Sequence, residues 1–239
     1  MTAQQQELLA SLKGRLVVSC QAYPGEPLRD ARAMMLIAQS AIVGGAAGIR
    51  AQGLDDIELI HRHVRVPQIG LWKVSGNDVF ITPTLEAALA VARAGAEVVA
   101  IDGTRRQRPD GLTLAQTIAA IHEQAGVLVM ADCGSVDDGL SAQDAGADIV
   151  GTTLAGYTGE REHVGEPDVA LVRELARRVQ VPVFAEGRIH TPEQAAQALE
   201  AGAHSVVVGT AITHISTITS WYVQALEQTR TEVSSRASG

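Results

Sequence analysis

The sequence predicts an α/β fold, a single (β/α)8 TIM barrel, and three observations predict it. Eight short predicted strands alternate with helical segments. An Ala-Gly pair recurs at 94–95, 125–126, 145–146 and 201–202, as expected of repeated βα units. Hydrophobic residues make up 46% of the chain and aromatic residues only 3%, so small aliphatic side chains must fill the core. Helices packed on a parallel sheet allow such a core.

The predicted elements follow one another without a linker, so we expect one barrel domain over residues 1–239. A short amphipathic helix over residues 1–12 comes first and can cover one end of the barrel. Strands are predicted at 16–20, 47–49, 67–72, 98–101, 127–131, 148–150, 181–185 and 205–208. Helices are predicted at 30–43, 54–62, 82–94, 114–124, 137–144, 168–179, 191–201 and 216–230. The polar segment 231–239 is predicted to be frayed.

The segment from Phe184 to Thr213 illustrates how one unit is specified. Thr191 can cap a helix, Pro192 suits its first position, and glutamates leave an alanine face free to pack.

The alternative fold, a doubly wound open sheet, would carry a glycine fingerprint after an early strand. The glycine-rich stretch 44–48 precedes a strand instead and is interpreted as a helix stop. The barrel is therefore favoured.

The composition argues against several classes of protein. A net charge of −8 argues against a nucleic-acid surface, because phosphate contacts need clustered Lys and Arg. No apolar run approaches the ~20 residues that span a bilayer, so no membrane partner is expected. The segment 1–14 lacks the apolar core of a signal peptide. Cys20 and Cys133 match neither a CxxC pair nor a metal-ligand spacing. We therefore expect a cytoplasmic protein with two free thiols.

Polar residues or glycine stand at the predicted strand exits. In this fold the C-terminal ends of the strands converge on one mouth, where catalytic residues lie. Each residue alone could serve only in an ion pair or hydrogen bond at the rim. Together, one lysine, one arginine and several carboxylates have the composition of an active site. The exits carry Gln21, Arg50, Lys73, Asp102, Asp132, Thr152, Glu186 and Gly209.

Lys73 is the most informative of these residues. The chain has only one other lysine, Lys13, and its remaining basic residues are arginines, which do not lose a proton near neutral pH. A lysine at a barrel mouth can act as an acid or base, or form a Schiff base. Glu186 and Asp132 could orient the ammonium, bind sugar hydroxyls or share proton transfer. Arg50 could hold a developing oxyanion.

A phosphate site is predicted at the exits of the last two strands. Gly187 and Gly209 allow backbone amides to approach a bound anion, and Arg188 adds a positive charge. The alternative is that these glycines only form turns.

No pair of histidines has a helical metal spacing with a carboxylate nearby, so we predict no metal site.

Several motifs in one order resemble the N-acetylmannosamine-6-phosphate 2-epimerase family of bacterial sialic-acid breakdown. The resemblance covers nearly the whole chain. The motifs are VSCQA at 18–22, GIRA at 48–51, IG at 69–70 shortly before Lys73, ITPT at 81–84, the arginine-containing run after Asp102, MAD at 130–132, VGTTLAGYT at 150–158, AEGRI at 185–189 and VVVG with AIT at 206–213.

The resemblance implies a role for each candidate site residue and implies no organic cofactor. Lys73 would move the proton of a phosphosugar substrate at C2, with Glu186 and Asp132 as catalytic carboxylates. The remaining assignments are substrate contacts for Arg50 and Gln21, and the phosphate end for Gly187, Arg188, Gly209 and Thr210. Three places depart from the family pattern: Cys133-Gly134-Ser135, Trp72, and Thr210 with His214-Ile215.

Other functions remain open at this point. A Schiff-base lyase or synthase would use Lys73 covalently. A flavin-binding barrel would hold its phosphate on the same two glycine segments, and a non-catalytic phosphosugar-binding module would need only the binding residues. Barrels of this size with few aromatic residues often pair, so a homodimer is expected.

Overall fold

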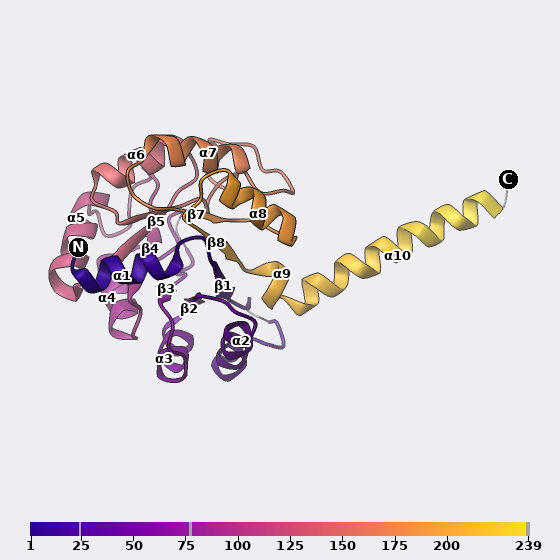
Figure 1. Cartoon of the computed structure of the whole chain (residues 1–239), viewed down its shortest axis with the longest axis horizontal. Helices are drawn as coiled ribbons and strands as arrows, with labels where there is room; N and C mark the ends of the chain where they lie inside the picture. The colour runs from indigo at the N-terminus through magenta and orange to yellow at the C-terminus, as the bar shows by residue number, and fades with distance from the viewer. Residues whose placement is uncertain (24, 77, 238–239) are drawn as a thin grey trace.

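The computed structural model describes residues 1–23, 25–76 and 78–237 and consists of a closed barrel of eight parallel strands ringed by helices (Figure 1). Each strand pairs with its neighbours in sequence, and β8 pairs with β1, Val17 opposite Val207. The predicted fold class is thereby confirmed. The strands are β1 (Leu16–Cys20), β2 (Gly48–Gln52), β3 (Gln68–Leu71), β4 (Val98–Asp102), β5 (Leu128–Asp132), β6 (Ile149–Gly151), β7 (Val183–Glu186) and β8 (Ser205–Val208).

The helices lie close to their predicted positions. Helix α8 begins as its sequence predicts, since the Thr191 hydroxyl accepts the N–H of Gln194 at 3.3 Å and Pro192 occupies the first helical position. The helices are α1 (Ala3–Leu12), α2 (Ala31–Val43), α3 (Leu54–His63), α4 (Leu85–Arg93), α5 (Leu114–Ala125), α6 (Val136–Asp144), α7 (Val169–Arg178), α8 (Pro192–Glu200), α9 (Thr210–Thr213) and α10 (Ile215–Ala237).

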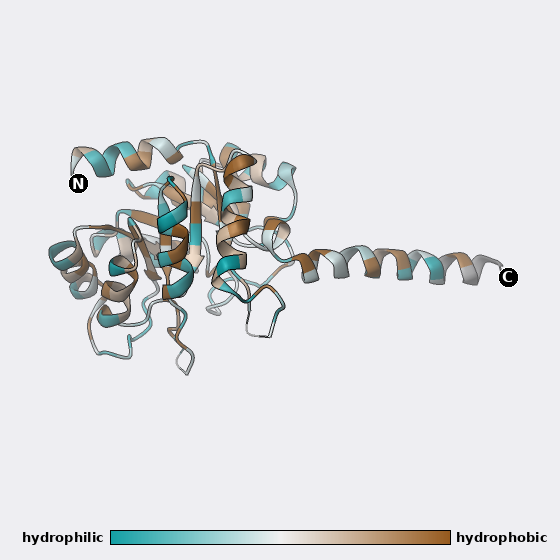
Figure 2. Cartoon of the chain, turned by 90° about the horizontal axis from the view of Figure 1, so that it is seen from below, coloured by the Kyte–Doolittle hydropathy of each residue, from teal (hydrophilic) through white to brown (hydrophobic). Residues whose placement is uncertain are grey.

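Side chains alternate along each strand between the inside of the barrel and its helical coat. On β4, Val98 belongs to the inner hydrophobic cluster and Val99 to the outer one. Leu9 and Leu12 of α1 join the inner cluster, and Figure 2 shows α1 lying across one end of the barrel. Helix α1 therefore closes the end where the strands begin, and the opposite end remains for a binding site.

Helix α10 departs from the prediction. It runs from Ile215 to Ala237 and projects away from the barrel (Figures 1 and 2). The helix includes residues 231–237, a stretch without glycine or proline to end it, and the frayed tail over 231–239 stays a prediction. The end of the predicted tail, 238–239, lies outside the described residues. Among the described helices, none has the length and apolar character needed to cross a bilayer.

Candidate active site

A cavity of about 670 Å³ opens at the ends of the strands opposite α1. Its size suits a small phosphorylated ligand. Asp132, also predicted for the site, is not among the described residues that line the cavity. The sequence-predicted residues that do line it are Gln21, Arg50, Lys73, Glu186, Gly187, Arg188, Gly209 and Thr210.

Arg50 is the central cation beneath the cavity. It lies within β2, two residues before the strand ends, whereas the sequence predicted it just after a shorter strand. Its side chain is 1% exposed and binds Asp132 through two nitrogens, with Nη2···Oδ2 at 2.7 Å and Nη1···Oδ1 at 3.2 Å. Nη1 also lies 3.1 Å from Oε2 of Glu186. The guanidinium thus joins the ends of β2, β5 and β7.

Asp132 lies behind Arg50 at the end of β5. Its side chain has no exposed surface. Besides the bond from Arg50, its Oδ1 accepts a hydrogen bond from the hydroxyl of Thr153 at 2.7 Å. The sequence left the separate roles of Asp132 and Glu186 open. Only Glu186 faces the cavity, so Asp132 can act on a ligand only through the residues it holds.

Glu186 is the carboxylate at the cavity wall. Its main chain is fixed by Thr152, whose Oγ1 accepts the N–H of Glu186 at 3.0 Å and donates to its carbonyl at 2.9 Å. Burial raises the pKa of Glu186 to about 7, although the charge of Arg50 opposes the shift. The nearby charge of Asp132 adds to the rise. Glu186 can therefore carry a proton near neutral pH.

Lys73 follows β3 and is held by a short antiparallel pairing with Ile81. The sequence predicted that Thr82 takes part in opening the next helix. Instead, Thr84 caps α4, and Thr82 has a positive φ of 43° with its hydroxyl accepting the N–H of Trp72 at 3.0 Å. Thr82 therefore helps to fix the segment that carries the lysine.

The lysine amine sits among polar and aromatic groups. Its Nζ donates to Oε1 of Gln21 at 2.8 Å and lies 5.4 Å from the centre of the Tyr23 ring. Burial lowers the pKa of Lys73, and the positive charge of Arg50 lowers it further. Glu186 and Asp132 act in the opposite direction. The shift favours the neutral amine, which is the form that can accept a proton.

The exits of β7 and β8 form the other side of the cavity. Gly187 has a φ of 117°, which a residue with a side chain rarely adopts, and Gly209 precedes the short helix α9, which starts at Thr210. Arg188 lines the cavity but donates through Nε and Nη1 to the carbonyls of Glu166 and Ala155, at 2.9 and 2.8 Å. Through these bonds Arg188 fixes the loop that follows β6.

Comparisons with known proteins agree with the motifs. A family model described as "Putative N-acetylmannosamine-6-phosphate epimerase" matches residues 34–228. A protein of Cutibacterium acnes named "Putative N-acetylmannosamine-6-phosphate 2-epimerase" is 55% identical over 221 residues, which are 92% of this chain and 96% of that protein. A relative of the same name from Caldanaerobacter subterraneus is 44% identical over 229 residues, 95% of this chain and 97% of that protein. The chain belongs to the N-acetylmannosamine-6-phosphate epimerase family.

A solved structure supports membership of the epimerase family. The chain resembles the N-acetylmannosamine-6-phosphate 2-epimerase from Clostridium perfringens with a TM-score of 0.88 and 40% sequence identity. The match covers 91% of this chain and 96% of that structure. The resemblance inferred from the motifs is thus confirmed at the level of both sequence and fold.

Two other strand exits do not extend the site. Asp102 is buried outside the cavity lining that the described residues form, and it binds Thr104 and Arg106, with Oδ1 accepting the Thr104 hydroxyl at 2.6 Å. Asp102 therefore stabilises its own loop through hydrogen bonds and an ion pair at the rim of the barrel, which was one of the two roles expected from the sequence. Thr152 holds the backbone of Glu186. Within the described ranges, no group of three or more His, Cys, Asp or Glu is placed to hold a metal ion.

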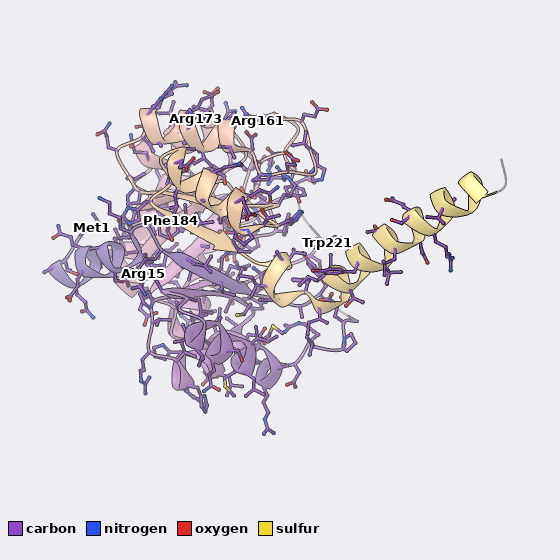
Figure 3. The ribbon with its side chains drawn as sticks, turned by 45° about the vertical axis from the view of Figure 1, so that its right-hand side comes forward. Met1, Arg15, Arg161, Arg173, Phe184 and Trp221 are labelled. Carbon is purple, nitrogen blue, oxygen red and sulfur yellow. The ribbon has the colours of Figure 1, made fainter. Side chains whose placement is uncertain are left out.

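Sequence reasoning missed part of the epimerase-family cavity. Trp221 of α10 packs on His190 with ring centres 4.7 Å apart, and both line the cavity. Figure 3 shows Trp221 where α10 leaves the barrel. A closing helix carries no strand-exit signal, so this residue could not be found in that way. Thr153 also lines the cavity, and its position in the VGTTLAGYT motif directly after a strand was the available signal.

Proposed function

We propose that this chain inverts C2 of N-acetylmannosamine 6-phosphate to give N-acetylglucosamine 6-phosphate, an isomerase step in sialic-acid and amino-sugar catabolism. The observation that carries the proposal is that Lys73 and Glu186 line one cavity with opposite pKa shifts. Such shifts move a base and an acid toward neutral pH, where general acid-base catalysis is most efficient. The names of the relatives support the same substrate.

Lys73 is assigned to the proton on carbon. The open-chain sugar has its carbonyl at C1, so the neighbouring C2 proton is the acidic one. Neutral Nζ accepts that proton, and the released electron pair forms the C1–C2 double bond of the enol. Gln21 supports this step because its Oε1 accepts an N–H of Lys73 and leaves the nitrogen lone pair for the substrate.

Glu186 is assigned to the proton on oxygen. Its protonated carboxyl donates to the carbonyl oxygen while C2 loses its proton, and Arg50 stabilises the negative charge that develops. On the return step the oxygen gives its proton back to Glu186. For inversion, the enol turns its other face toward Lys73, whose ammonium then protonates C2 there, and the double bond becomes a carbonyl again.

The phosphate end and Asp132 serve this chemistry indirectly. Gly187, Gly209 and Thr210 line the cavity where backbone amides can approach an anion, so we assign them to the phosphate. Binding there orients the sugar and contributes to catalysis without touching C2. Asp132 keeps Arg50 in place through its paired hydrogen bonds.

The pH dependence of turnover is expected to be bell-shaped. Activity rises with pH as Lys73, with its lowered pKa, loses its proton, and falls as Glu186 is ionised near pH 7. Glu186→Gln should remove the alkaline limb and slow turnover about 10²-fold, measured as kcat against pH. Glu200→Gln, on the exposed end of α8, is the matched control and should keep the wild-type profile.

One experiment tests the proposed activity. Purified protein is incubated with N-acetylmannosamine 6-phosphate, and proton NMR follows the anomeric signals of both epimers. The proposal expects conversion to an equilibrium mixture that is reached from either sugar. No conversion would reject it. Borohydride added during turnover tests the Schiff-base alternative, which predicts a stable sugar adduct on Lys73, whereas the proton-transfer mechanism predicts none.

We also infer that the protein forms a homodimer through α10. Tyr222, Leu226 and Val233 are 71%, 71% and 59% exposed and recur at spacings of four and seven residues, so they share one helix face. An apolar stripe on a helix that leaves the barrel is costly in water unless another surface covers it. A second copy of the same helix can cover it symmetrically.

Charges on this stripe are expected to dissociate the dimer. Tyr222→Glu combined with Leu226→Glu should convert the protein to a monomer, because burying two carboxylates costs several kcal/mol. Light scattering after size exclusion measures the mass. Gln224→Glu adds one charge to the same exposed turn and should leave the mass unchanged. A wild-type protein of monomer mass would contradict the inference.

A cytoplasmic location is part of the proposal. It is supported by Cys20 and Cys133, which are buried free thiols, as is usual in a reducing compartment.

A further inference from the structure

The hydroxyl of Thr153 lies between two carboxylates. Its Oγ1 is 2.7 Å from Oδ1 of Asp132 and 3.2 Å from Oε2 of Glu186. Thr153 stands two residues beyond β6 and lines the cavity. A hydroxyl has one hydrogen and two acceptor lone pairs, so it can donate to only one of these oxygens at a time.

The two contacts suit different protonation states of Glu186. When Glu186 carries a proton, the hydroxyl can donate to Asp132, as the shorter distance favours, and its lone pair can accept from the Glu186 carboxyl. When Glu186 is ionised, rotation of the hydroxyl lets it donate to Glu186 instead. Asp132 loses little in the exchange, because both of its oxygens still accept from Arg50.

We propose that Thr153 is a positioning residue that holds Glu186 in both of its protonation states and so lets the carboxyl exchange a proton during each turnover. The inference rests on the proposed function, in which Glu186 gives and takes the proton on oxygen. Thr153 itself makes no bond to the reacting carbon in this role. Without it, the ionised carboxylate loses one of its donors and the acid loses its acceptor, and both losses are costly for a buried group.

The charged groups around Glu186 do not replace this hydroxyl. Arg50 from β2 lies 3.1 Å away and is a donor only, so it can serve the ionised carboxylate but not the protonated acid. Asp132 from β5 acts on Glu186 by charge, as does Lys73 beyond β3. On the β8 side, Val207 is the residue paired with Glu186. Among the described residues, Thr153 is therefore the recognised contact of the Glu186 carboxyl group that can both donate and accept.

The neighbouring threonine provides a matched control. Thr152 binds the main-chain N–H and carbonyl of the same glutamate through its hydroxyl. Thr152→Val and Thr153→Val thus remove one hydroxyl each from adjacent residues, but only the second removes a contact to the carboxyl group. Thr153→Ser keeps the hydroxyl and tests whether the methyl group matters.

The test measures the pKa of Glu186 directly and its effect on turnover. Carbon-13 NMR of the labelled side-chain carboxyl gives the pKa in the free protein, and the pH profile of kcat gives it in the complex with substrate. Thr153→Val should raise both values by about one unit, because the bond it donates to the ionised carboxylate is charge-assisted and outweighs the weaker bond it accepts from the acid. It should also lower kcat about tenfold at the optimum. Thr153→Ala takes its place if the valine variant does not fold.

The expected pattern separates this inference from the proposed function. Thr153→Ser and Thr152→Val should both keep the wild-type pKa, although Thr152→Val is expected to lower the melting temperature. An unchanged pKa in Thr153→Val, or an equal shift in Thr152→Val, overturns the role of Thr153 while leaving epimerisation intact. Absence of epimerisation in the wild type overturns the proposed function and the catalytic part of the inference together.

Discussion

Lys73→Ala is expected to reduce epimerisation by about 10²- to 10⁴-fold or more, since it removes the group that takes the proton from C2. The fold should persist, because the Lys73 side chain lies at the cavity wall, where it donates a hydrogen bond to Gln21, and not in the hydrophobic core. Turnover is measured by the ratio of the two epimers with time, and stability by thermal unfolding. Lys73→Arg keeps the positive charge but cannot give a neutral base, so it should be nearly as inactive.

A residual rate close to wild type in Lys73→Ala would contradict the assignment. So would an active Lys73→Arg variant, since it would mean that charge alone, and not proton transfer, is what this position supplies. The pair of variants therefore distinguishes a base from an electrostatic contact.

Arg50→Met is expected to have the second large effect, on stability as well as activity. It leaves Asp132 buried without its charged partner, and breaking a buried ion pair in this way costs about 3–5 kcal/mol. Urea unfolding measures the loss. Activity should also disappear, because the negative charge that develops on the substrate oxygen loses the cation assigned to stabilise it.

A double variant separates the two effects. Arg50→Met combined with Asp132→Leu removes both buried charges, and we expect it to regain most of the lost stability without regaining activity. Recovery of activity in the double variant would show that Arg50 serves only the fold. Failure to regain stability would show that the pair with Asp132 is not what Arg50→Met disrupts.

The barrel and most of its mouth could be predicted because their signals are local. Lys73 follows a short apolar run and Glu186 ends another, and a polar residue in that position is placed at the mouth by the fold itself. Start signals such as Thr191-Pro192 fix where helices begin. These signals need no knowledge of distant parts of the chain.

The relations between residues could not be predicted, since they depend on side-chain reach across the barrel. Asp102 and Asp132 both end a strand, but only Asp132 meets Arg50, and neither lines the cavity among the described residues. The contact between Trp221 of α10 and His190 at the cavity likewise has no local motif that predicts it. Roles at one mouth therefore have to be assigned from geometry.

The most direct test of the account is the fate of the C2 hydrogen during turnover in deuterium oxide. The Lys73 ammonium carries two solvent hydrogens besides the one taken from C2, so the returned hydrogen should mostly come from solvent. Proton NMR and mass spectrometry should then find deuterium at C2 of newly formed N-acetylglucosamine 6-phosphate. A product that forms at the normal rate with its C2 hydrogen fully retained would contradict lysine-mediated proton transfer.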